Sequence, residues 1–242
     1  TANPLINPKN LQVDAVLEIP LGFPLVPANV RYTSELLGYI VDGLKVRYPF
    51  LSVGSIGRSV MRKELLYLKL GDGPQEVCYN ASFHANESIT TPVLLKFAEE
   101  YGEEYARALR GEANSEFPVE ELFQRFSLYL IPMVNPDGVD LVNGVLTSGD
   151  FYRQAVRIAA DFPDIPFPDG WKANIDGVDL NLQFPASWEE ARKIKYAKGY
   201  TKPAPRDYVG MAPLTEPESI AMYEFTREHE FELILAYHTQ GE

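Results

Sequence analysis

Two histidines and one glutamate form the pattern in this sequence that is best suited to chemistry. His84 and Glu87 stand three positions apart in "HANE", and His238 lies far downstream in "AYHTQGE". Imidazole nitrogen and carboxylate oxygen are ligands that Zn²⁺ prefers, and a catalytic zinc site commonly uses three protein ligands and leaves the fourth position open. The three side chains therefore predict a site for one zinc ion per chain.

The elements around these residues explain how they could meet. His84 ends the strand predicted for "EVCYNASFH", and His238 ends the strand predicted for "FELILAYH". A third predicted strand, "SLYLIPMVN", leads into the polar turn at Asn135 to Gly138. Ligands of α/β sheets bind at the carboxyl ends of the strands, so we expect these three strand ends at one edge of the sheet.

Helical patterns alternate with these strands. One apolar face is predicted behind a Thr or Ser cap over residues 33–50, and a long helix with Pro92 in its first turn follows the strand that ends at His84. A helix after Thr215 is expected to open with a capping box formed by Thr215 and Glu218. Residues 139–175 are expected to be irregular. This order predicts an α/β fold with a mixed, largely parallel central sheet flanked by helices.

Two further polar residues bear on the site. Asp179, in "GVDLN", stands where its carboxylate could accept the second ring N–H of a ligating histidine. His229 falls in the last turn of a predicted helix, where a cation complements the helix dipole, and is given no catalytic role. A His-x-x-Glu pair alone is common by chance, so the zinc hypothesis depends on the strand ends and on Asp179 together.

Composition excludes several classes of partner. The chain has 22 basic and 34 acidic side chains, and its net charge of −12 opposes binding to nucleic acid or to an anionic membrane surface. No apolar run reaches the roughly 18 residues of a membrane span. The single cysteine, Cys78, excludes an internal disulfide and a zinc site built on thiolates.

Four motifs in order resemble one known family. The sequence contains "HANE", "NPDG", "GVDLN" and "AYH", and this order is similar to that of the zinc carboxypeptidases. Over roughly residues 30–242 it resembles more narrowly the bacterial branch that cleaves γ-D-glutamyl-diaminopimelate bonds, on the stretches "YNASFHANESITTPVL", "WKANIDGVDLNLQFPASW", "PLTEPE" and "LAYHTQGE". The resemblance implies zinc-dependent hydrolysis of that amide bond in a peptidoglycan stem peptide or muropeptide.

The same resemblance implies roles for individual residues. His84, Glu87 and His238 would ligate zinc, and Asp179 would support His84. Two more positions match by type: Asn181 would bind substrate, and Lys172, in "WKAN", would polarise the scissile carbonyl and contact substrate.

Two departures from the family pattern change these expectations. Leu182 stands where ordinary carboxypeptidases have an arginine that pairs with the terminal carboxylate, and leucine cannot make that bidentate bond, so general C-terminal cleavage is not expected. The family's general-base Glu lies well downstream of the second histidine, so we expect it to be missing from the chain as given, and Glu242 is interpreted as an ordinary polar residue.

The N-terminal segment is too short for a core of its own and is expected to be an arm or a fragment of something larger. Residues 1–26 contain "INPKNLQVDAVLEIP", which resembles the closing half of a LysM module; an irregular N-terminal arm is the alternative. Residues 27–242 are predicted to form the peptidase domain, C-terminally incomplete. The chain as given contains no signal peptide, and its location is left open between a bacterial cell wall or spore and the cytoplasm.

Two other functions are compatible with this sequence. A degenerate peptidase fold could bind peptidoglycan without cutting it, and a zinc deacylase could use the same scaffold on small N-acyl amino acids. Hydrolysis of a stem peptide by the metal-loaded protein distinguishes the three.

Overall fold

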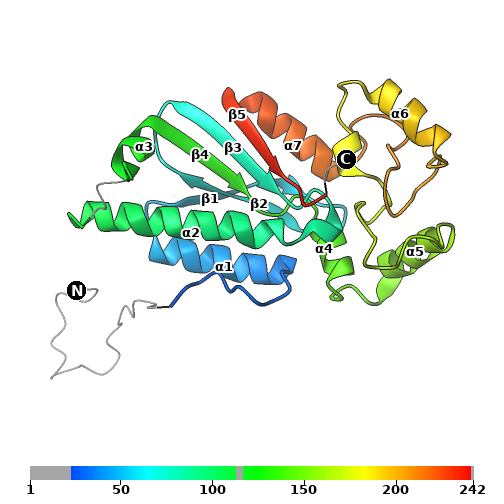
Figure 1. The fold of residues 1–242 in the computed structure, drawn as a ribbon, viewed down its shortest axis with the longest axis horizontal. Helices are drawn as coiled ribbons and strands as arrows, with labels where there is room; N and C mark the ends of the chain where they lie inside the picture. The colour runs from blue at the N-terminus through cyan, green and yellow to red at the C-terminus, as the bar shows by residue number, and fades with distance from the viewer. Residues whose placement is uncertain (1–22, 113–116, 241–242) are drawn as a thin grey trace.

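A five-stranded sheet organises the protein, in the strand order β1-β2-β4-β3-β5 (Figure 1). The computed structural model describes residues 23–112 and 117–240. Two strand pairings, β1 with β2 and β2 with β4, are antiparallel, whereas β4 with β3 and β3 with β5 are parallel, so the predicted mixed sheet is confirmed. The strands are β1 (Ser52–Arg58), β2 (Glu64–Leu70), β3 (Gln75–Ala81), β4 (Phe126–Ile131) and β5 (Phe231–Tyr237).

Helices cover both faces of the sheet because successive side chains of a strand point to opposite faces. Val77 and Leu128 pack with the apolar residues of α1 and α2, while Cys78 and Tyr129 pack against Phe225 of α7 on the other face. The helices described are α1 (Ser34–Arg47), α2 (Thr90–Leu109), α3 (Val119–Arg125), α4 (Pro136–Val142), α5 (Gly149–Ala160), α6 (Trp188–Ala197) and α7 (Pro217–Glu228).

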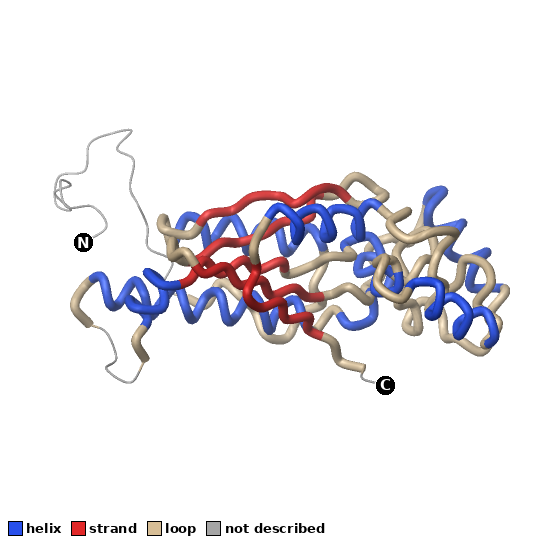
Figure 2. Tube along the Cα trace, turned by 90° about the horizontal axis from the view of Figure 1, so that it is seen from above, coloured by secondary structure: helices blue, strands red, loops and turns tan. Residues whose placement is uncertain are grey.

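The three mutually parallel strands end at the same side of the sheet. Beyond this side lie α5 and α6 with long loops, whereas the strands occupy the middle of the molecule (Figures 1 and 2). This arrangement confirms the expectation that the strands before His84, Asn135 and His238 deliver them to one edge. β5 pairs only with β3 among the described strands, and Leu233, Ile234 and Leu235 are 40–47% exposed.

Part of the predicted secondary structure is wrong. Residues 139–175, expected to be irregular, contain the end of α4 and all of α5, whose small residues Ala155 and Ala159 are buried. The prolines of this range, Pro163, Pro166 and Pro168, come only after α5 has ended. β1 and α6 were not predicted, and β3 ends three residues before His84.

The predicted capping box before α7 does not form. The Thr215 hydroxyl donates to Gln183 Oε1 at 3.0 Å rather than capping the helix, and α7 begins at Pro217 after Glu216 without a side-chain cap. Glu218 Oε1 instead accepts the backbone N–H of Val60 at 3.0 Å. The two polar side chains therefore bind neighbouring segments: the Thr215 hydroxyl joins the group of donors around Gln183 Oε1, and Glu218 satisfies the backbone N–H of Val60.

The N-terminal prediction falls largely outside the described part of the chain. Residues 1–22 lie there, so the LysM resemblance and the division at residues 26 and 27 stay predictions. No helix in the described ranges combines the length and the apolar character needed to cross a membrane.

Glu218 makes the stability of the fold depend on pH. Its side chain is fully buried, and burial raises the pKa of Glu218 from 4.5 to about 7. The folded protein therefore holds this proton more tightly than the unfolded chain does, which favours folding below pH 4.5. That contribution is lost as the pH rises through about 7.

We expect Glu218→Gln, which stays neutral, to avoid this loss. The free energy of unfolding is measured by urea denaturation. The value for the variant minus the value for the native protein should rise by on the order of 3 kcal/mol as the pH is raised from 4.5 to 7.5. Glu224→Gln, on the exposed side of α7, is the control and should show no such gain. A difference between Glu218→Gln and the native protein that is constant over this pH range would contradict the explanation.

Candidate active site

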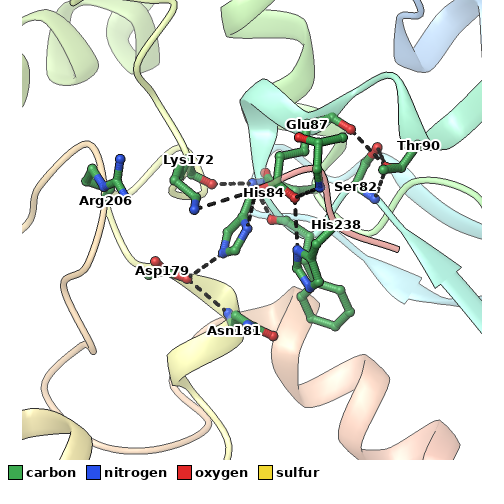
Figure 3. A network of polar contacts seen from close by, with 12 residues as sticks. Ser82, His84, Glu87, Thr90, Lys172, Asp179, Asn181, Arg206 and His238 are labelled. Carbon is green, nitrogen blue, oxygen red and sulfur yellow. Dashed lines mark hydrogen bonds and ion pairs between the residues drawn. The ribbon is translucent and has the colours of Figure 1, made fainter. Parts of the chain in front are cut away.

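His84, Glu87 and His238 meet beyond the carboxyl ends of β3 and β5. His84 Nδ1 lies 3.0 Å from Glu87 Oε1, and His238 Nδ1 lies 2.9 Å from Glu87 Oε2, so one carboxylate faces both rings (Figure 3). Each of the three residues offers one ligand atom, and these three atoms all lie within 4.8 Å of one another. The structure thus brings the predicted set together, and its metal-binding role stays a prediction.

Hydroxyl groups fix the turn that carries the first two of these residues. Ser82 has a left-handed backbone (φ 52°), and its N–H donates to Thr90 Oγ1 at 3.0 Å. The Thr90 hydroxyl donates to the carbonyl of Glu87 at 2.8 Å, and Thr91 Oγ1 donates to Pro132 O at 2.6 Å. The serine and threonines of "NASFHANESITTP" therefore hold the short 3₁₀ turn at Ala85–Glu87 against the start of α2.

Asp179 supports His84 from the opposite side of the ring. Asp179 Oδ1 lies 3.2 Å from His84 Nε2, as the sequence predicted, which leaves Nδ1 directed at Glu87. The other oxygen, Oδ2, accepts the N–H of Asp207 at 3.2 Å. A histidine held in this way presents a fixed nitrogen to a metal ion.

The charges of this cluster depend on one another. Burial alone would lower the pKa of His84, but hydrogen bonds to Asp179 and Glu87 raise it to about 9. For Glu87, burial acts to raise the pKa, yet hydrogen bonds from His238 and His84 hold it well below its usual value. In the metal-free protein the Glu87 carboxylate thus stays ionised between two imidazoles.

This donor set fits a zinc ion. Two imidazole nitrogens and one carboxylate are among the ligand sets of catalytic zinc sites, which keep a fourth position open. Glu87 is fully buried, and a buried carboxylate requires cationic partners, which a divalent ion would supply. His229, the third histidine, lies away from this set, with its Nδ1 3.0 Å from both oxygens of Glu76.

The asparagine of "NPDG" supports the site by holding two segments of the chain together. Asn135 donates from Nδ2 to Phe83 O at 3.1 Å and to Ala173 O at 3.0 Å, which joins the turn before His84 to the segment that carries Lys172. A Cβ on Gly138 would lie 2.7 Å from Ala173 O, so this close approach requires glycine.

A pocket of about 350 Å³ opens beside the cluster. The predicted residues Lys172, Asp179 and Asn181 line it, as does Leu182. Lys172 is 7% exposed, and its Nζ lies 3.5 Å from Glu87 Oε1. The remaining lining residues are His84, His238, Lys195, Asp207 and Gln240.

Sequence reasoning missed Lys195, Asp207 and Gln240. The first belongs to α6, where a lysine is ordinary, and the second lies in the loop between α6 and α7. No motif or strand end marks either residue, because they reach the pocket only through the path of residues 183–210. Gln240 lies two residues after His238 in "AYHTQGE", and this proximity to a predicted ligand was the one signal available.

Comparison with known proteins agrees with this geometry. The sequence pattern of the family described as zinc carboxypeptidase (Peptidase_M14) matches residues 39–242. The chain is 40% identical over 222 residues to gamma-D-glutamyl-L-diamino acid endopeptidase 1 of Lysinibacillus sphaericus, which covers 91% of this chain and 54% of that relative. It is 47% identical over 202 residues to the uncharacterized protein YqgT of Bacillus subtilis strain 168, which covers 81% and 50%. The chain spans about half the length of these curated relatives.

Solved structures show the same fold. Bovine thrombin-activatable fibrinolysis inhibitor aligns with a TM-score of 0.62 at 19% identity, covering 88% of this chain and 62% of that one. Carboxypeptidase A from Helicoverpa armigera aligns with a TM-score of 0.60 at 21% identity, covering 87% and 46%. At these identities the likeness concerns the fold alone.

The ligand assignment predicts which histidines control metal content. His84→Ala and His238→Ala should each lose stoichiometric zinc, measured by atomic absorption after dialysis, because a set of three ligands tolerates the loss of one poorly. His229→Ala is the matched control and should keep one zinc per chain, because this ring pairs with Glu76 instead. Full zinc content in either of the first two variants would refute the assignment.

Asp179 should matter for metal affinity without being a ligand. We expect Asp179→Ala to weaken zinc binding by about 10–100-fold in a competition titration with a chelator, as the loss of a residue that orients a ligand does. Asp176→Ala is the control, because Asp176 accepts from Gln154 at 2.8 Å and does not contact His84. Equal zinc affinity in the native protein and Asp179→Ala would mean that Asp179 only stabilises its turn.

Proposed function

Because the chain belongs to the zinc carboxypeptidase family, we propose that it is the metal-binding part of a peptidase and holds one zinc ion through His84, Glu87 and His238. The observation that carries this proposal is the meeting of both Nδ1 atoms on one buried carboxylate, beside an open pocket. Asp179 supports the site by fixing the ring of His84.

The proposed substrate is a γ-D-glutamyl-diaminopimelate amide bond in a peptidoglycan stem peptide or muropeptide. Support comes from the relative named as a gamma-D-glutamyl-L-diamino acid endopeptidase, which is 40% identical. Leu182 lines the pocket and offers no hydrogen bond to a carboxylate, which disfavours a general carboxypeptidase.

A bound zinc ion and the side chains of this pocket would have separate roles in the hydrolysis. A bound zinc ion supplies Lewis-acid polarisation of the carbonyl and lowers the pKa of water. Lys172, whose ammonium faces the cluster, is proposed to donate a hydrogen bond to the scissile carbonyl oxygen. Asn181 is exposed at the pocket, where its amide could orient the substrate.

The general base is proposed to lie outside the residues described. Within the described part of the pocket the carboxylates are already engaged, since Asp179 holds His84 and Asp207 lies between Lys195 and Arg206. Loss of a general base costs about 10²–10⁴ in rate. We therefore expect slow hydrolysis by a zinc-loaded sample that lacks this base and faster hydrolysis by a form of the protein that contains it, called the extended form below.

Substrate preference tests this proposal. The extended, zinc-loaded form should cleave a γ-D-glutamyl-meso-diaminopimelate peptide with a kcat/KM about 10-fold or more above that for a C-terminal hydrophobic dipeptide, because Leu182 cannot form the charge-assisted bond that fixes a terminal carboxylate. Release of the free amine is the measurement, and a zinc-stripped sample is the control.

The other two functions give different results in the same assay. Tight binding of the stem peptide with no turnover by the extended form would indicate a non-catalytic peptidoglycan-binding protein. Faster cleavage of N-acyl amino acids would indicate a deacylase, and equal rates on ordinary dipeptides would reject the peptidoglycan substrate.

A further inference from the structure

We propose that Asn174 is a positioning residue for the metal site, which sets the direction of Asp179 and, through it, the ring of His84. The inference rests on the proposed function, because it assigns this role toward the proposed zinc ion. Asn174 stands between Lys172 and Asp179 in "WKANIDGVDLN" and is fully buried. It is not among the described residues that line the pocket, so it acts on a bound ion only through other groups.

The amide oxygen of Asn174 closes the loop that leads to Asp179. Oδ1 accepts the backbone N–H of Asp176 at 3.1 Å and that of Val178 at 3.0 Å. The backbone N–H of Asn174 donates to Val178 O at 2.9 Å, and its carbonyl accepts from Gly177 at 3.1 Å. These hydrogen bonds fix the loop, and the next residue along the chain is Asp179.

The amide nitrogen of Asn174 anchors this loop to the start of α7. Nδ2 donates to Glu216 Oε2 at 2.6 Å and lies 3.5 Å from Glu218 Oε2. The other oxygen of Glu216, Oε1, lies 2.9 Å from the hydroxyl of Thr215. Both ends of the Asn174 amide are therefore used, and a hydrogen bond to a carboxylate is stronger than one between neutral groups.

Glu216 is placed for this contact rather than for the helix that follows it. It is 7% exposed, and α7 begins at Pro217 without a side-chain cap. Burial raises the pKa of Glu216, whereas the hydrogen bonds from Asn174 and Thr215 act to lower it. Burying a carboxyl group costs free energy unless hydrogen bonds compensate, and Asn174 provides one of them.

Asp179 transmits the geometry of the loop to the metal site. Its backbone N–H donates to Tyr208 O at 2.8 Å, and its Oδ1 accepts from Asn181 N at 3.2 Å. The same Oδ1 lies 3.2 Å from His84 Nε2 (Figure 3). The side chain of aspartate is short, so the direction of its carboxylate follows the backbone that the loop fixes. A loosened loop would release the ring from the orientation that a metal ligand needs.

An exchange of donor and acceptor tests the Asn174–Glu216 pair. Asn174→Asp keeps an oxygen for the loop but replaces the Nδ2 donor by a second oxygen that faces Glu216. We expect it to bind zinc about 10-fold more weakly than the native protein in a chelator competition titration, at the lower end of the loss for groups that orient a ligand. Glu216→Gln should bind zinc nearly as the native protein does, because its amide oxygen can turn toward Asn174.

The double variant Asn174→Asp/Glu216→Gln should recover the affinity. The acceptor then stands at position 174 and the donor at position 216, so the hydrogen bond re-forms in the opposite direction, and the zinc Kd should return to within about 3-fold of the native value. Ser127→Ala is the control. It removes a buried hydrogen bond to Gly73 O, 2.7 Å long, at the opposite edge of the sheet, and should lower the melting temperature without weakening zinc binding.

The ring of His84 provides a second measurement that needs neither zinc nor turnover. The exchange of its Nε2 proton with water is followed by NMR in the metal-free protein, and the signal is assigned by its loss in His84→Ala. In Asn174→Asp this exchange should be about 10-fold faster than in the native protein, because the hydrogen bond to Asp179 is weakened. The double variant should restore the native rate.

Two results would overturn the inference. One is native zinc affinity together with native His84 proton exchange in Asn174→Asp, and the other is a double variant that recovers neither. If Asn174→Asp does not fold, Glu216→Ala takes its place, since it removes the partner of Nδ2 and leaves the loop residues unchanged. A native protein that binds no zinc, or does not cleave the stem peptide, would refute the proposed function, whereas the proton exchange of His84 would still decide the role of Asn174.

Discussion

The buried carboxylate of Glu87 is the interaction on which this site depends. It is fully inaccessible to solvent and ionised, and an isolated charge in such a position would cost several kcal/mol. Two imidazoles, the Lys172 ammonium and the N–H of Thr239 offset that cost. Residues from three separate stretches of chain must therefore be in place before Glu87 can be buried, so the fold and the proposed metal site are stabilised together.

Hydrogen bonds from side-chain amides stabilise the loops that form the pocket. Asn135 joins the turn before His84 to residue 173, and Gln183, also fully buried, donates to Val209 O at 2.5 Å and accepts from Thr215 N at 2.7 Å. An amide suits this purpose because it both donates and accepts, so one side chain satisfies backbone groups of two loops without adding charge next to the proposed metal. These contacts let irregular segments keep a defined geometry.

The sequence predicted the centre of the site better than its walls. His84 and His238 each follow an apolar strand. Neighbouring parallel strands end at the same edge of a sheet, whatever path the loops take, so the meeting of the two histidines could be inferred from the strands alone. Asp179 was singled out because its carboxylate could accept the second ring N–H of a ligating histidine, and the resemblance to a known motif implies the same role. Lys195 and Asp207 depend on how residues 183–210 run, which no periodic pattern encodes. Glu218 illustrates the same limit: its spacing from Thr215 fits a helix cap, but its carboxylate accepts the N–H of Val60 from a distant loop instead.

The position of β5 has a consequence for dynamics. This strand carries His238, yet among the described strands it is hydrogen-bonded on one side only, and its apolar residues are half exposed. Edge elements with few buried contacts open locally at a lower free energy than the centre of a sheet. A metal ion that binds only when β5 is docked would shift this opening equilibrium toward the closed state. Amide hydrogen exchange along β5 would then report metal occupancy, although most of its amides lie far from the ligands.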